Sequence, residues 1–218
     1  MFFKLSKAIR SIFKLIIFIL VLSIILGLAI SIIFPIGYKD YINKYSKEYD
    51  IDPFLVAAII KVESNYNKDA ASQKDARGLM QIGPQTGIWA SEELGIEGYS
   101  PESLFEPEVN IRIGVWYINI LKKEFNNNMN LVLAAYNAGS GNVNKWLSDK
   151  SYSSDGSKLD KIPFEETDEY LDKVKFNYQV YNKLYTNYMG KPDSMNNLYT
   201  DVIISLRTYF KDILKSLR

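Results

Sequence analysis

The chain has 218 residues and a net charge of +1 at neutral pH, and it contains neither cysteine nor histidine. These absences exclude a disulfide framework, a thiolate nucleophile, a serine–histidine–aspartate triad and the usual zinc sites, so we expect no metal and no cofactor. Lys and Arg do not gather into a basic stripe, so we expect no nucleic-acid partner. Any chemistry must therefore use carboxylates, hydroxyls, amides or backbone groups.

A long apolar segment follows a short basic N-terminus. Four cations and no acid lie in residues 1–14, namely Lys4, Lys7, Arg10 and Lys14. No residue from 15 to 38 is charged, and a helix of this length crosses a hydrocarbon core of about 30 Å. We therefore predict a transmembrane anchor over residues 15–37. The positive-inside rule places the basic segment in the cytoplasm and the body outside the cell membrane.

Two other interpretations of this segment stay open. A cleaved signal peptide is the main alternative, although its best cleavage site, Ala29-Ile30-Ser31, is poor because more Ile and Phe follow. The other is a buried core helix, which an uninterrupted apolar run at the terminus disfavours.

Helical periodicity dominates the remainder of the chain, and no alternating strand pattern persists. In chain order, we predict helices over 38–51, 53–64, 108–125, 130–138 and 166–188, with shorter helical pieces around 76–82 and 84–94. Asp52 and Pro53 are typical of an N-cap and a first helical residue. The sequence predicts one mainly α domain over residues 38–189, with at most a small β element.

A separate amphipathic helix is predicted within residues 190–218. Its apolar face consists of Leu198, Val202, Leu206, Tyr209, Phe210, Ile213 and Leu217. Such a helix can pack on the body, lie in the membrane interface or mediate self-association.

Glu63 borders the apolar side of its predicted helix, formed by Leu55, Ala58, Ile59 and Val62. A carboxyl that emerges from an apolar surface has a raised pKa, which suits a general acid near neutral pH. Position alone does not distinguish this role from that of a solvated residue at the edge of the helix.

Five short motifs lie in order along the chain. They are Glu63-Ser64; Gly78-Leu79-Met80-Gln81-Ile82; Asn110-Ile111 with Gly114 and Tyr117; Ala135-Tyr136-Asn137-Ala138-Gly139; and Ile162-Pro163 before Glu166-Thr167 and Tyr170. In this order and spacing, residues 40 to 188 resemble the soluble lytic transglycosylase (SLT) domain family, which has a goose-type lysozyme-like fold.

The resemblance implies a role for seven residues. Glu63 matches the catalytic glutamate of the family. Six others match positions that bind the glycan substrate: Ser72, Gln81, Tyr136, Asn137, Glu166 and Tyr170. One departure concerns the residue after Ile82, where the family's best-studied members have Met and this chain has Gly83, so an apolar sugar contact is missing there.

The resemblance implies a membrane-anchored peptidoglycan lytic transglycosylase. Glu63 would act first as acid and then as base, cutting the bond between N-acetylmuramic acid and N-acetylglucosamine without water and leaving a 1,6-anhydro sugar. Peptidoglycan strands and the membrane are the expected partners. Two alternatives are a muramidase that admits water with help from Asp69, Asp75 or Glu166, and a non-catalytic wall-binding component of a membrane machine.

Overall fold

A computed structural model describes residues 2–186 of the chain. It separates into an N-terminal unit, described as far as Ile36, and a second unit that begins at Gly37. Each unit is described by itself. The amphipathic helix predicted within 190–218 and the last two residues of the helix predicted over 166–188 lie outside the described residues.

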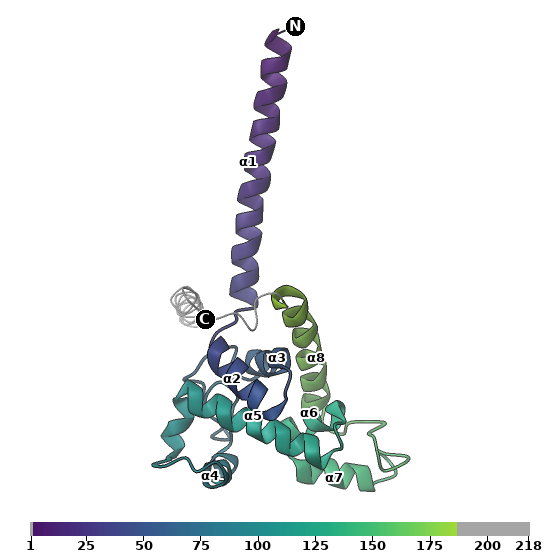
Figure 1. The fold of residues 1–218 in the computed structure, drawn as a ribbon. Helices are drawn as coiled ribbons and strands as arrows, with labels where there is room; N and C mark the ends of the chain where they lie inside the picture. The colour runs from purple at the N-terminus through teal and green to yellow at the C-terminus, as the bar shows by residue number, and fades with distance from the viewer. Residues whose placement is uncertain (1, 187–218) are drawn as a thin grey trace. The chain divides into compact units, whose positions relative to one another are not determined.

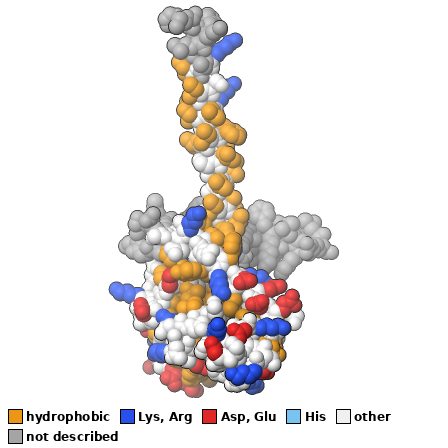
Figure 2. Space-filling view, turned by 90° about the vertical axis from the view of Figure 1, so that its right-hand side faces the viewer, with side chains coloured by type: hydrophobic (Ala, Val, Ile, Leu, Met, Phe, Trp, Pro, Cys, Tyr) orange, Lys and Arg blue, Asp and Glu red, His pale blue; other side chains and the backbone are white. Residues whose placement is uncertain are grey.

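The described part of the N-terminal unit contains one helix, α1, over Phe2–Ile33 (Figure 1). Its stretch Ile9–Ile33 is long and apolar enough to cross a membrane. Most of its large apolar side chains from Ile9 to Ile33 are exposed, and on the face shown in Figure 2 hydrophobic side chains run along the helix while Lys or Arg side chains lie toward its N-terminal end. The helix ends at Ile33, because Pro35 lacks a backbone N–H and disfavours helical geometry at Phe34.

The second unit is mainly α, as predicted, and its described part contains no strand (Figure 1). Its elements are α2 (Lys39–Tyr49), α3 (Pro53–Glu63), α4 (Pro84–Glu93), the 3₁₀ helix η1 (Pro101–Phe105), α5 (Pro107–Glu124), α6 (Met129–Ala138), α7 (Ser140–Ser148) and α8 (Glu165–Tyr185). The helix α3 packs against α2 and α8, while α5 packs against α2, α4 and α6.

The central helix α3 begins as the sequence predicts. The Asp52 side chain accepts a hydrogen bond from the Phe54 N–H at 2.8 Å, and Pro53 occupies the first helical turn. Every residue from Leu55 to Ile60 is buried. The buried surface is therefore wider than the predicted apolar stripe, because α3 lies between two other helices and has no solvated face along these residues.

One local prediction was wrong. Residues 76–82 form a tight turn and not a helical piece, closed by two backbone hydrogen bonds of 3.0 Å between Arg77 and Ile82. Gly78 (φ 76°) and Gln81 (φ 49°) adopt left-handed backbone conformations, which interrupt a right-handed helix. In addition, α7 was not predicted; Gly139 (φ 87°) separates it from α6.

The 77–82 turn is anchored to α5 by a buried asparagine, Asn110. Its side-chain amide donates to the carbonyls of Arg77 (2.9 Å) and Leu104 (2.7 Å), and its oxygen accepts from the Met80 N–H at 2.7 Å. Gly114 allows the same close approach, because a Cβ built there would lie 2.4 Å from the sulfur of Met80. The turn is thus held against α5 by packing and by hydrogen bonds.

Candidate active site

Glu63 is the last residue of α3, and its carboxyl is largely desolvated by the surrounding protein. This burial is the main cause that raises its pKa from 4.5 to about 7. The protonated and ionised forms of the Glu63 carboxyl are therefore almost equally populated near neutral pH. A carboxyl in this condition can both donate and accept a proton.

The helix α8 brings Tyr170 and Glu166 to Glu63. The Tyr170 hydroxyl is buried without a hydrogen bond of standard geometry in the described part of the chain. It lies near enough to the Glu63 carboxyl to favour the carboxylate, which partly offsets the rise in pKa. The exposed Glu166 acts in the opposite direction, because its negative charge raises the pKa of Glu63.

Tyr136 approaches the same group from α6. Desolvation raises the pKa of its hydroxyl, and the charge of Glu63 raises it further. This hydroxyl donates a hydrogen bond of 2.9 Å to the Met80 carbonyl in the 77–82 turn. Its ring contacts that of Tyr117 on α5, with the centroids 5.7 Å apart. Glu63, Tyr136, Glu166 and Tyr170 therefore form one cluster, drawn from three helices that are distant in sequence.

Asn137 and Gln81 each follow a residue of this network in the chain, since Asn137 follows Tyr136 and Gln81 follows Met80. The Asn137 side chain accepts a 2.8 Å hydrogen bond from the hydroxyl of Thr167, and this bond links α6 to the first turn of α8. The Gln81 amide nitrogen donates to the carbonyls of Ala70 (3.1 Å) and Gly78 (2.9 Å). Both side chains thus stabilise the backbone around the cluster, and each retains polar capacity for a ligand.

Ser72 lies on a loop and not on a helix. It is exposed in the loop before the 77–82 turn, and its hydroxyl oxygen accepts from the N–H groups of Lys74 (3.2 Å) and Ala76 (3.1 Å). Within residues 2–186, no hydrogen bond or ion pair joins Ser72 to Glu63. Its hydroxyl proton remains available to an acceptor brought by a ligand.

Two residues that support the site are not among the seven residues predicted from the sequence. The Met80 carbonyl positions Tyr136, and Thr167 positions Asn137. The Gly78-Leu79-Met80-Gln81-Ile82 and Glu166-Thr167 motifs contain both residues. However, any residue type has a backbone carbonyl that can accept a hydrogen bond, and threonine is common in the first turn of a helix. Neither role could therefore be predicted from the residue type.

The other candidate carboxylates differ from Glu63. Asp69 is exposed and forms an ion pair of 2.9 Å with Lys68, and the exposed Asp75 pairs with Arg77 at 3.0 Å. Neither interaction connects these aspartates to the Glu63 cluster. Glu166 is the carboxylate that the structure places near Glu63.

Gly83, where the resemblance implies a methionine, lies directly before α4. A Cβ built on Gly83 would meet no atom within 4 Å, so the space beside this position is open in the described structure. The missing apolar contact is therefore not replaced by a neighbouring side chain at that point.

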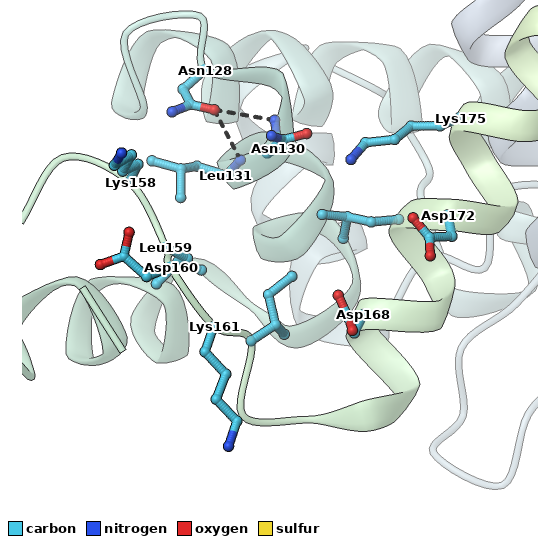
Figure 3. Close-up of a pocket in the computed structure, with 12 residues that line it drawn as sticks. Asn128, Asn130, Leu131, Lys158, Leu159, Asp160, Lys161, Asp168, Asp172 and Lys175 are labelled. Carbon is cyan, nitrogen blue, oxygen red and sulfur yellow. Dashed lines mark hydrogen bonds between the residues drawn. The ribbon is translucent and has the colours of Figure 1, made fainter. Parts of the chain in front are cut away.

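A hollow of about 440 Å³ lies between the start of α6, the segment 158–162 and α8 (Figure 3). Asp168, Asp172 and Lys175 line it from α8, and Lys158, Asp160 and Lys161 line it from the preceding segment. None of the seven predicted site residues lines this hollow. It is thus distinct from the Glu63 cluster.

The helical fold of the second unit, with Glu63 at the end of its central helix α3, is similar to the lysozyme-like helical domains of the soluble lytic transglycosylases. The chain belongs to the transglycosylase SLT domain family, whose model matches residues 40–158.

Several proteins are similar to this chain. The soluble lytic murein transglycosylase of Escherichia coli K12 is 37% identical over 166 residues, which cover 75% of this chain and 25% of that protein. The membrane-bound lytic murein transglycosylase C of Photorhabdus laumondii is 36% identical over 115 residues, covering 49% of this chain and 32% of that protein. This chain therefore matches only about a quarter to a third of the length of these relatives.

Solved structures show the same likeness. The 70 kDa soluble lytic transglycosylase of Escherichia coli superposes with a TM-score of 0.61 and 32% identity, over 75% of this chain and 27% of that one. The lytic transglycosylase Slt of Pseudomonas aeruginosa superposes with a TM-score of 0.62 and 32% identity, over 71% of this chain and 25% of that one. The latter structure is of an inactive variant in which a glutamate is replaced with glutamine.

Proposed function

We propose that the chain is a membrane-anchored peptidoglycan lytic transglycosylase with Glu63 as its single catalytic acid and base. The observation that carries this proposal is the buried Glu63 carboxyl, whose pKa of about 7 lets it exchange a proton in both directions near neutral pH. Membership of the SLT domain family and similarity to lytic murein transglycosylases support it. The inactive glutamate-to-glutamine variant of the Pseudomonas aeruginosa relative is consistent with a catalytic carboxyl in this fold.

The reaction begins with protonated Glu63. It donates its proton to the oxygen between N-acetylmuramic acid and N-acetylglucosamine, and the bond from that oxygen to C1 of the muramoyl sugar breaks. The N-acetyl group of the substrate stabilises the cationic centre, as in substrate-assisted glycosidases. The muramoyl 6-hydroxyl then attacks C1 while Glu63, now a carboxylate, accepts its proton. The products are a 1,6-anhydromuramoyl end and a free 4-hydroxyl, and water is not consumed.

The surroundings of Glu63 suit both steps. Desolvation and the charge of Glu166 favour the protonated form that the first step needs. The Tyr170 hydroxyl favours the carboxylate that the second step needs. Because Asp69 and Asp75 are exposed and paired with cations, they do not supply a buried second carboxylate. The remaining predicted residues, Ser72, Gln81, Tyr136 and Asn137, would bind the sugars.

We propose that α1 anchors the chain in the cell membrane, with the N-terminus inside and the catalytic unit on the outer side. The length and apolar surface of Ile9–Ile33 and the basic residues before this stretch support this topology. The name of the membrane-bound relatives supports membrane association. The enzyme would thus act on wall close to the membrane.

Product analysis tests the proposal. The full chain in detergent micelles is incubated with purified peptidoglycan, and the released fragments are measured by mass spectrometry. Anhydromuramoyl ends are expected; fragments heavier by one water molecule, with free reducing ends, would identify a muramidase instead.

A matched pair of variants tests the role of Glu63. Glu63→Gln should abolish release while glycan binding persists, and Glu169→Gln, on the solvated side of α8, should retain full activity. Unchanged release by Glu63→Gln would refute the catalytic assignment. Absence of release by the wild-type chain, with binding retained, would instead favour the wall-binding alternative.

A further inference from the structure

The helix α4 carries two large apolar side chains that the described structure leaves uncovered, Ile88 and Trp89. Trp89 is 41% exposed, whereas Trp116 and Trp146, the two other tryptophans of the chain, are 6% and 7% exposed. An exposed tryptophan leaves a large apolar surface in water, so its environment requires an explanation.

The Trp89 ring is held in one orientation by two aromatic neighbours on α5. It packs at 69° to Trp116 with centroids 4.7 Å apart, and at 83° to Tyr117 with centroids 6.5 Å apart. Edge contacts of this kind are favourable and directional, so they fix the ring while part of its surface stays open. A ring fixed in this way suits a ligand that has flat apolar faces.

Trp89 is also continuous with the Glu63 cluster. Tyr117, which contacts Trp89, also contacts Tyr136 with centroids 5.7 Å apart. Tyr136 in turn lies close enough to Glu63 for the charge of that carboxyl to raise the pKa of the Tyr136 hydroxyl. Two ring contacts therefore lead from Tyr136, beside the proposed catalytic group, to the exposed tryptophan.

We propose that Trp89 is a stacking platform for a distal sugar of the same glycan strand that Glu63 cuts, with Tyr117 as the link between the two. This inference rests on the proposed function and adds a binding position to it. The ligand is an N-acetylated hexosamine ring, whose apolar C–H face packs on the aromatic ring.

A lipid surface fits Trp89 less well than a glycan does. The helix α4 contains no Lys or Arg, and its last turn carries Glu92 and Glu93. Anionic membranes attract basic segments and repel acidic ones. The continuity with Tyr136 also points to a ligand that occupies the Glu63 cluster at the same time.

The exposure of Trp89 provides a binding assay that does not depend on catalysis. In the full-length Glu63→Gln variant in detergent micelles, Trp89 should dominate the emission that acrylamide quenches, because Trp116 and Trp146 are buried. Peptide-free glycan strands, prepared with an amidase, should lower this quenchable fraction, and the effect should vanish in the Glu63→Gln, Trp89→Phe double variant. Saturating glycan binding with unchanged quenching of Trp89 would overturn the proposal, as would protection by anionic lipid vesicles but not by glycan.

Kinetics on the otherwise wild-type chain give a second test. Trp89→Ala should raise KM for long glycan strands about three- to tenfold with kcat nearly unchanged, and Trp89→Phe should raise it less. The effect should disappear for the shortest fragments that are cut, because they do not reach Trp89; a purely structural role would affect all lengths equally. Phe176→Ala, which removes an exposed ring from α8, is the control and should change neither parameter.

The outcomes separate this inference from the proposed function. Normal release of anhydromuramoyl ends by Trp89→Ala, with unchanged KM at every strand length, overturns the platform and leaves the activity of Glu63 intact. Failure of the wild-type chain to release any fragment, together with glycan protection of Trp89, removes the proposed function and retains the binding surface.

Discussion

Replacing Glu63 with glutamine should stabilise the folded protein at and above neutral pH, and the size of this effect should depend on pH. The reason is the raised pKa of the buried carboxyl, about 7 in the folded state against 4.5 in the unfolded chain. Between these two values the folded state binds more protons at Glu63 than the unfolded state does. The free energy of unfolding of the wild type therefore falls as pH rises through this window, and it levels off above the folded pKa.

The magnitude follows from the two pKa values. Each unit of difference corresponds to about 1.4 kcal/mol, so the free energy of unfolding should fall by about 3 kcal/mol from Glu63 alone between pH 4.5 and pH 8. Glutamine has the shape of the protonated acid but does not titrate. The two proteins should have similar stability at pH 4.5, and Glu63→Gln should be more stable by about 3 kcal/mol at pH 8.

Urea unfolding at several pH values measures this difference. All three tryptophans lie in the unit that begins at Gly37, so their emission reports its unfolding in the full chain held in detergent micelles. The control is Glu169→Gln, because an ion pair with Lys173 lowers the pKa of this exposed carboxyl and its small effect should have the opposite sign. Parallel stability curves for wild type and Glu63→Gln from pH 4.5 to pH 8 would falsify the raised pKa and, with it, the physical basis of the acid role.

Three further substitutions test the surroundings of Glu63. Tyr170→Phe should move the high-pH limb of the pH–activity profile to higher pH, since it removes a hydroxyl that lowers the pKa of Glu63. It should hardly change the free energy of unfolding, because that hydroxyl has no standard hydrogen bond. A high-pH limb that moves to lower pH would contradict this reasoning. Asn110→Leu should lower the free energy of unfolding by about 3 kcal/mol in urea unfolding, because it removes three hydrogen bonds and leaves the buried Met80 N–H and Leu104 carbonyl without these partners. Full retained stability would exclude this role. Gly114→Ala should lower the free energy of unfolding by about 1–3 kcal/mol in the same assay, because its Cβ meets the sulfur of Met80. Gly83→Ala is the control and should leave stability nearly unchanged, because its Cβ meets open space. Equal losses of stability in the two variants would contradict the packing argument.

Much of the helical order was predictable from local patterns. The start of α3 at Asp52 and Pro53, the long α5 and the short α6 follow from capping residues and apolar periodicity, and both are properties of neighbouring residues. The 77–82 turn was not predictable in this way. Its left-handed Gly78 and Gln81 are stabilised by Asn110, whose hydrogen bonds reach the turn from α5, about thirty residues further along the chain.

The sequence by itself determined which chemistry is available. Without histidine or cysteine, a carboxyl is the natural candidate for the proposed acid, and the resemblance to the SLT domain family singles out Glu63. Only the tertiary structure decided that this carboxyl is an acid near neutral pH. The protein that desolvates it and the groups that adjust its pKa, Tyr170 and Glu166, come from helices that chain folding brings together. The pKa of a carboxyl depends on the charges and the water within a few ångströms of it, and a sequence does not record which distant residues lie there.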